Sequence, residues 1–169
     1  MRTSCSMLAI CSVLSLMAFN PALGDEPSST QPYDAEAAFE QLKSLAGEWI
    51  DNNNPNDAAE EVHFRVIGAG SAVMATFFPG KPMEMISVFH MDGPERLVHT
   101  HYCALGNQPM MQFEACETPH AMNWVFIGGT NFDPEKDLHV HEGMIRVISP
   151  DEVESEFTAF SGGKPAGTT

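Results

Sequence analysis

Apolar positions in this chain first recur at helical spacing and then alternate with polar ones. Between Asp34 and Gly47 they recur every three or four residues, which places them along one side of a helix. Asp34 is a suitable N-cap for that helix, and Gly47 is a suitable stop. From Trp49 onward, short alternating runs are separated by turn residues, a pattern typical of antiparallel strands. The apolar positions of the helix are Ala35, Ala38, Phe39, Leu42, Leu45 and Ala46.

The alternating part predicts about nine strands at regular spacing. The expected fold is therefore mainly β: a single antiparallel up-and-down barrel of about nine or ten strands with one short N-terminal helix. Closing the sheet removes its exposed edges and leaves an interior that can hold a small ligand. Trp49 is expected at the barrel floor, packed against the helix. The predicted strands begin at Trp49 and continue over 61–67, 72–78, 83–91, 96–103, 110–117, 122–128, 138–148 and 153–160.

The end of the chain raises the question of how such a barrel closes. Gly162-Gly163-Lys164-Pro165 is turn chemistry, and we expect the four residues after it to be too few for a strand. A nine-stranded antiparallel meander leaves its first and last strands parallel. We therefore expect either a tenth strand beyond Thr169 or an open seam. We favour the missing strand and a monomer, whereas an open seam would favour pairing with a second copy.

Residues 1–24 have the pattern of a secretory signal peptide. Arg2 is followed by an apolar run over 7–19, then by Asn20-Pro21 and the small residues of 22–24. The run is shorter than the roughly 20 residues that cross a bilayer. We expect export to the periplasm or the medium after cleavage near Gly24, with no membrane span left. Residues 25–33 are then a flexible leader, and 34–169 form the barrel domain.

The charge of the chain excludes one class of partner. The formal net charge is −15, and loss of Arg2 with the signal makes it one unit more negative. Such a surface repels phosphate backbones, so nucleic acid is not an expected partner. Cleavage would also leave two cysteines, Cys103 and Cys116, which in an exported protein form a disulfide or remain as two free thiols.

Several motifs in the segment 39–168 resemble those of a known group. The most specific is His101-Tyr102-Cys103 followed by Gly106-Asn107-Gln108-Pro109. The segment resembles exported bacterial proteins with a lipocalin-like (calycin) β-barrel, and this resemblance implies the fold without an activity. More distant kin are fatty-acid-binding barrels and haem-binding nitrobindin-like barrels. The latter carry Gly-x-Trp-x-Gly, where this chain has Asp51 in place of the second glycine. Further matching segments are 39–49, 70–74, 79–80, 85–90 and 163–167.

Two His-x-His pairs are the candidates for metal chemistry: His99 with His101, and His139 with His141. Residues two apart in a strand share a face, so each pair can present two imidazoles to one zinc, copper or iron ion. On the strand 138–148, the apolar Leu138 and Val140 are expected to point inward, which sends His139 and His141 to solvent. Lining a polar ligand pocket and ordinary surface or core positions remain the alternatives. The candidate metal ligands are His99 and His101, with a third from His90, Glu142 or Glu114.

The abundant methionines and phenylalanines of the strands predict an adaptable apolar interior. We therefore expect an exported protein that holds a small apolar or amphipathic ligand in its barrel. No catalytic constellation is present and no cofactor is required by the sequence. The alternatives are a metal-dependent enzyme that uses the His-x-His pairs, and a partner-binding module with a filled barrel. The expected ligand contacts are His90, His101, Tyr102, Asn107, Gln108 and Trp124.

Overall fold

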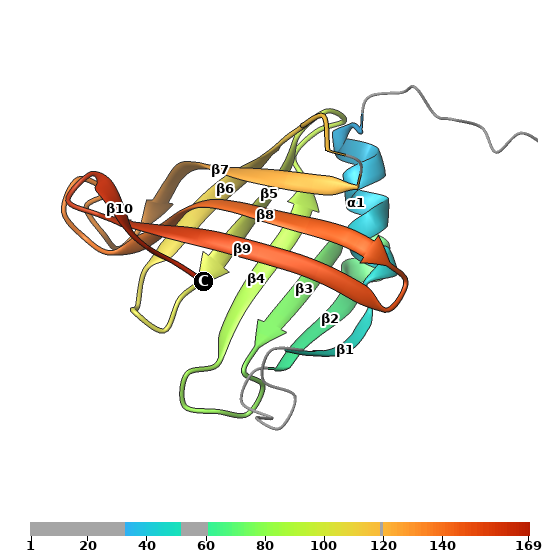
Figure 1. The fold of residues 1–169 in the computed structure, drawn as a ribbon, viewed down its shortest axis with the longest axis horizontal. Helices are drawn as coiled ribbons and strands as arrows, with labels where there is room; N and C mark the ends of the chain where they lie inside the picture. Colours follow the sequence, from blue (N-terminus) through green and yellow to red (C-terminus); the bar gives the residue numbers. More distant parts are fainter. Residues whose placement is uncertain (1–32, 52–60, 119) are drawn as a thin grey trace, which may run out of the picture. The chain divides into compact units, whose positions relative to one another are not determined.

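A computed structural model describes residues 33–51, 61–118 and 120–169 of the chain. The predicted signal peptide and the leader up to residue 32 lie outside these residues. The described part contains one α-helix, one 3₁₀ turn and ten strands (Figure 1). They are α1 (Ala35–Ser44), β1 (Gly47–Ile50), β2 (Glu61–Ile67), η1 (Gly68–Gly70), β3 (Ala72–Phe77), β4 (Met85–Met91), β5 (Leu97–Tyr102), β6 (Gln108–Glu114), β7 (Ala121–Thr130), β8 (His139–Ser149), β9 (Glu152–Ser161) and β10 (Lys164–Thr168).

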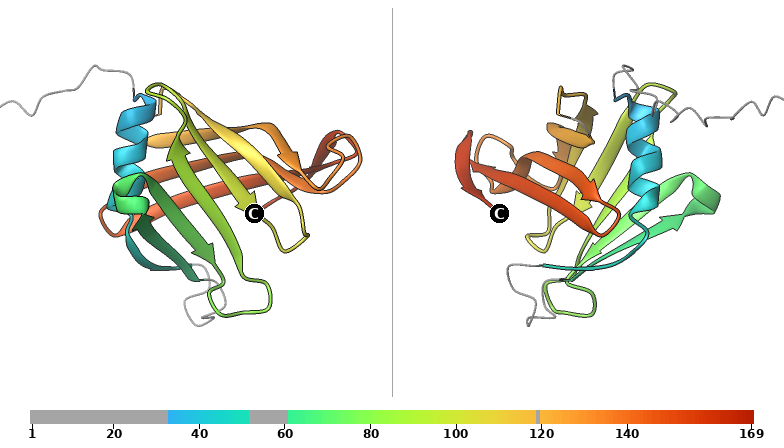
Figure 2. Two further views of the ribbon diagram at one scale, coloured as in Figure 1. Left: turned by 180° about the vertical axis from the view of Figure 1, so that it is seen from behind. Right: turned by 45° about the vertical axis from the view of Figure 1, so that its right-hand side comes forward.

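The ten strands form one antiparallel sheet in chain order, in which each strand pairs with the next. The sheet curls around one of its faces, so that β2–β5 and β7–β9 lie on opposite sides of a half-barrel (Figures 1 and 2). This confirms a mainly β, up-and-down arrangement. Within the described ranges, β1 pairs only with β2 and β10 only with β9. The predicted full closure is therefore replaced by an open curl.

Strand β10 corrects the prediction that residues 166–169 are too few for a strand. It pairs antiparallel with β9, with Lys164 opposite Ser161 and Thr168 opposite Thr158. Gly162 and Gly163 form a two-residue turn with φ angles of 60° and 68°, a conformation that glycine adopts without strain. The backbone N–H and C=O of Thr169 each bond to Phe157 at 3.0 Å. A tight glycine turn therefore lets a short segment pair with β9, with a register shift between Pro165 and Gly167.

Helix α1 lies across one end of the curled sheet (Figures 1 and 2). It begins where the Asp34 carboxylate accepts the N–H of Ala37 at 2.9 Å, as its sequence predicts, and ends at Ser44. Trp49 lies beside the end of the helix, where its indole N–H donates to the carbonyl of Leu45 at 2.8 Å. Its side chain is half-buried and packs against the core. No helix in the described ranges has the length and hydropathy needed to cross a bilayer.

The hydrophobic core fills the space between α1 and the adjoining part of the curl. Its members come from the helix and from alternate positions of β3–β8. Gly143 of β8 lets the ring of Phe157 on β9 pack against the backbone, because a Cβ at Gly143 would lie 2.4 Å from Cδ1 of Phe157. The largest fully buried core residues are Leu42, Leu45, Val73, Phe89, Leu97, Met111, Met122 and Trp124.

Candidate functional site

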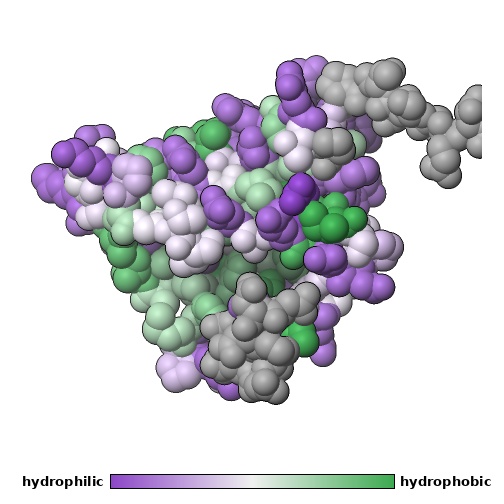
Figure 3. All heavy atoms as spheres, in the orientation of Figure 1, coloured by the Kyte–Doolittle hydropathy of each residue, from purple (hydrophilic) through white to green (hydrophobic). Residues whose placement is uncertain are grey.

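Alternate side chains of β2–β9 point into the curl and form what we call the concave face. The pairing register joins them across the strands: Phe64 lies opposite Ala75, Ala75 opposite Ser87, and Ser87 opposite His101. In Figure 3, apolar surface lies in a hollow beneath strand β9, below a band of polar surface. Away from α1 the concave face thus keeps apolar side chains that are only half-buried. They include Phe64, Phe77, Met85, Phe126, Phe157 and Phe160.

His99 lies deep in the concave face and has no hydrogen-bond partner. Its side chain is 2% exposed, and its ring centroid lies 4.6 Å from that of Phe89 and 4.7 Å from that of Trp124. Neither ring nitrogen of His99 has a partner, and the indole N–H of Trp124 has none either. Burial, with a smaller contribution from the charge of His101, lowers the pKa of His99 to about 3. His99 is therefore neutral at physiological pH.

His101, the next inward residue of β5, pairs with a serine that sequence reasoning missed. Its Nδ1 lies 2.9 Å from the hydroxyl oxygen of Ser87, and the edge of Phe77 packs nearby. Burial lowers the pKa of His101 to about 4. A serine and a histidine at this distance resemble a nucleophile and its base. However, β4 and β5 lie between paired strands, so their backbone N–H groups serve the sheet ladder rather than an oxyanion hole.

His139 and His141 correct the prediction that both point to solvent. Leu138, expected inward, is 43% exposed, whereas His139 is 1% exposed. Strand β8 begins at His139, so the inward positions are the odd-numbered ones that continue to Gly143. The imidazole of His139 is buried at low cost because both nitrogens are bonded: Nδ1 to the carbonyl of Asp137 and Nε2 to Nδ1 of His141, each at 2.9 Å.

Aromatic rings enclose this second histidine pair. His141 stacks between Phe126 of β7 and Phe160 of β9, at centroid distances of 4.8 and 4.0 Å. Phe132 lies 4.8 Å from His139. Burial and then the neighbouring His139 lower the pKa of His141. The only sequence signal for this cluster was the two-residue spacing of the histidines, because its aromatic neighbours come from other strands.

Asn107, which precedes β6, connects to the same end of the concave face. Its side-chain N–H₂ donates to the carbonyl of Leu138 at 2.7 Å, while its buried Oδ1 has no partner. Gln108, the next residue, occupies an outward position. Its amide is engaged locally with Gly106 at 3.0 Å and with the Thr130 hydroxyl at 2.8 Å. Of these two predicted ligand contacts, the geometry groups only Asn107 with the histidines.

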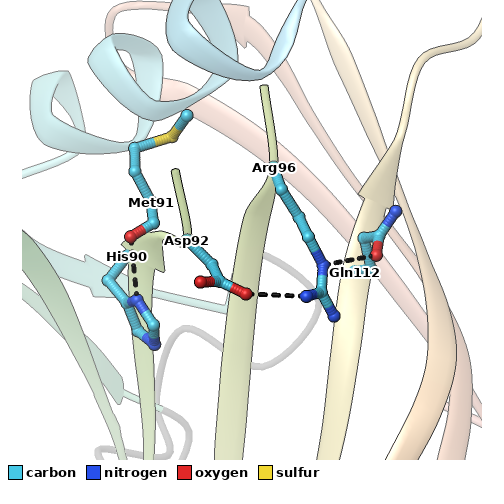
Figure 4. A network of polar contacts seen from close by, with 5 residues as sticks. All are labelled: His90, Met91, Asp92, Arg96 and Gln112. Atoms are coloured by element: carbon cyan, nitrogen blue, oxygen red, sulfur yellow. Dashed lines mark hydrogen bonds and ion pairs between the residues drawn. The ribbon is translucent and has the colours of Figure 1, made fainter. Parts of the chain in front are cut away.

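Two further predicted contacts, Tyr102 and His90, lie on the convex side. Tyr102 alternates with His101 along β5 and is 52% exposed. His90 alternates with Phe89 along β4, and its Nδ1 lies 3.2 Å from the carbonyl of Met91. Figure 4 shows this region, where Arg96 bridges Asp92 at 2.6 Å and Gln112 at 2.8 Å. The structure therefore does not bring Tyr102 and His90 together with His101, Asn107 and Trp124.

The candidate metal pair, His99 and His101, shares the concave face as its spacing predicts. Within the described residues, no three His, Cys, Asp or Glu side chains come together as a metal site. Glu142, Glu114 and His90, the expected third ligands, occupy outward positions. A metal site at His99 and His101 stays a prediction.

Cys103 and Cys116 are both free thiols. The Cys103 sulfur lies 3.9 Å from that of Met85, whereas the Cys116 sulfur lies 3.6 Å from the carbonyl of Ala121. The sequence left open a disulfide or two free thiols, and the structure has two free thiols.

A groove outside the concave face lies between α1 and the turn that joins β8 to β9. Its volume is about 360 Å³, and its lining includes Gln41, Leu45, His120, Val147 and Pro150. The groove presents mixed polar and apolar groups without a cluster of titratable residues. The histidine and phenylalanine side chains therefore make the concave face the stronger candidate site.

Comparison of the chain with protein-family models, with curated proteins and with solved structures found no match. The assignment of a function therefore rests on the geometry of the concave face.

Proposed function

We propose that the concave face binds a small apolar or amphipathic molecule. The observation that carries this proposal is the combination of half-buried phenylalanines with histidines that face them from neighbouring strands. Phe126, His141 and Phe160 form one continuous stack across β7, β8 and β9. Apolar surface of this kind gains free energy when a ligand removes it from water, at about 25 cal/mol per Å² of area buried. The histidines and Asn107 supply the few polar contacts that orient such a ligand.

A buried polar atom without a hydrogen-bond partner favours a ligand with a polar end over a purely apolar ligand. A buried polar group without a hydrogen bond costs about 1–3 kcal/mol. Asn107 carries such an atom, its Oδ1, at one end of the concave face, whereas those of His99 and Trp124 lie deeper, in the core. A ligand with one polar end would offset part of this cost, whereas a hydrocarbon would not.

The same proposal places the protein in a lipocalin-like architecture and outside the cytoplasm. The curled up-and-down sheet with a helix across one end supports the architecture. Export is proposed from the pattern of residues 1–24. An exported carrier or sensor of small amphipathic molecules is the function that these features support best.

The proposal is tested by energy transfer from tryptophan to a neutral fluorescent probe, N-phenyl-1-naphthylamine. Trp49 and Trp124 both lie on the inward side of the sheet, so a probe bound there quenches their emission. We expect saturable binding that weakens about tenfold in Phe160→Asp, because a carboxylate would replace an apolar contact. Met110→Asp, on the outward side of β6, is the matched control and should bind as the parent does. A parent protein that does not bind the probe, or equal loss in both variants, would contradict the proposal.

A further inference from the structure

We propose that the molecule bound on the concave face is uncharged and presents a hydrogen-bond donor, such as a hydroxyl or a primary amide, to His141 and Asn107. This inference rests on the proposed function and names the chemical class of its ligand. Three features carry it: the direction of the hydrogen bonds through the second histidine pair, the free acceptor of Asn107, and the charges of the face.

The hydrogen bonds of His139 determine which nitrogen of His141 carries a proton. The carbonyl of Asp137 can only accept, so Nδ1 of His139 must donate to it. In a neutral imidazole the other nitrogen is then an acceptor, and Nε2 of His139 accepts from Nδ1 of His141 at 2.9 Å. Nε2 of His141 is left with a lone pair and no proton. It is therefore an acceptor to which a ligand can donate a hydrogen bond.

Asn107 supplies a second acceptor near the hydrogen-bonded histidine pair. Its N–H₂ group points at the carbonyl of Leu138, which fixes the orientation of the amide. The opposite atom, Oδ1, is buried without a partner. Leu138 directly precedes His139, so the acceptors of Asn107 and His141 belong to one end of the concave face. An acceptor-only ligand would leave both of them unpaired.

The strands place no charged side chain on the concave face, although the carboxylates of Glu142 and Glu135 lie near enough to act against the lowering of the pKa of His141. In strands β1–β9, alternation places every Asp, Glu, Lys and Arg on the outward side, including Arg65, Glu142 and Arg146. Arg146 is held there by Glu154 at 2.5 Å. Burial lowers the pKa of His99 to about 3 and that of His101 to about 4, so both are neutral at physiological pH, and burial also lowers the pKa of His141. A carboxylate, phosphate or ammonium would lose water on this face without gaining a counter-ion.

Four probes with one alkyl chain test the inference: dodecanol, methyl dodecanoate, dodecanoate and dodecylammonium. Each is titrated by calorimetry, the two neutral probes below their solubility limits and the two ions below their micelle concentrations. A salt concentration on the order of 0.5 M screens the net charge of the protein. We expect dodecanol to bind about tenfold more tightly than the ester, which lacks a donor, and more tightly than either ion. Equal or tighter binding of the ester or of an ion overturns the inference and leaves the proposed function standing. If none of the four binds, the proposed function itself fails.

A variant pair assigns the acceptor. His141→Phe keeps a ring between Phe126 and Phe160 but removes the lone pair, so the preference for dodecanol over the ester should fall from about tenfold to about twofold. His63→Phe, on the outward side of β2, is the matched control and should keep the preference. A preference that stays intact in His141→Phe overturns the role of that residue. If His141→Phe does not fold, Asn107→Leu provides the same comparison.

Discussion

The two His-x-His pairs have the same spacing and face the same interior, yet their surroundings differ. His99 is sealed between Phe89 and Trp124, and neither of its nitrogens has a partner. His139 and His141 are hydrogen-bonded to each other at 2.9 Å, and the other ring nitrogen of His139 bonds to the backbone carbonyl of Asp137. One pair therefore makes the core sensitive to acid, while the other presents a directed acceptor. The neighbouring strands, rather than the spacing of the histidines, decide what each pair can do.

The largest difference between the two regions should appear when their aromatic walls are removed. Trp124→Ala deletes a fully buried ring beside His99 and should cost about 3–5 kcal/mol of the free energy of unfolding. Phe126→Ala deletes a half-buried ring beside His141 and should cost clearly less. Urea unfolding of both variants measures the comparison. Equal losses would show that the two regions are equally well packed.

Acid should act mainly through the first pair. The pKa of His101 is about 4 in the folded protein against an ordinary value of 6.5, and that of His99 is about 3. The unfolded chain then binds more protons than the folded one below pH 6.5, so stability falls as the pH falls. His101 alone should account for about 3 kcal/mol of this loss as the pH falls to about 4.

Urea unfolding between about pH 7 and about pH 4 measures this loss of stability. His99→Leu removes one of the two neutral histidines, so its stability should depend less steeply on pH than that of the parent. An equally steep dependence in the variant would contradict the role given to His99.

Gly143 tests how closely the strands of the second region approach each other. A Cβ at this position would lie 2.4 Å from the Phe157 ring, so Gly143→Ala should cost about 1–3 kcal/mol. Gly167→Ala on β10 is the control, because no atom lies within 4 Å of the added methyl group. Thermal unfolding of the two variants compares the effects. A loss in Gly167→Ala as large as that in Gly143→Ala would refute the explanation.

The smallest effect is expected at Tyr102, which the sequence suggested as a ligand contact. Its side chain lies on the convex side and is 52% exposed. Tyr102→Ala should therefore bind N-phenyl-1-naphthylamine within about twofold of the parent, a change of less than about 0.5 kcal/mol. The same fluorescence titration measures it. A tenfold loss of affinity in Tyr102→Ala would contradict this account, because it would place the binding surface on the convex side of β5.

The periodicity of the sequence predicted the elements of the fold well. The helix, its Asp34 cap, the successive strands and the contact of Trp49 with the end of the helix are all present. These features depend on local spacing and turn chemistry, which a sequence displays directly. The tenth strand was missed because the turn was expected to extend through Pro165. Gly162-Gly163 form a tighter turn, so β10 already begins at Lys164.

The candidate site was less predictable, because its contacts join distant strands. His101, Asn107 and Trp124 were suggested as ligand contacts from their types, which stays a prediction, and Ser87 was missed because only the register places it opposite His101. His139 was assigned to solvent because Leu138 looked like the first inward residue of its strand. Two local hydrogen bonds, to Asp137 and His141, and the ring of Phe132 make the buried histidine acceptable, and the spacing of residues along β8 does not reveal them.

The most direct test of ligand binding on the concave face is an NMR titration of the protein with dodecanol. The account predicts that the backbone amide shifts of Phe64, Phe126, Phe157 and their inward neighbours change together and saturate. The backbone amides of residues that line the groove beside α1, such as Gln41 and Ser149, should keep their shifts. Changes confined to that groove, or no saturable change at all, would contradict the account.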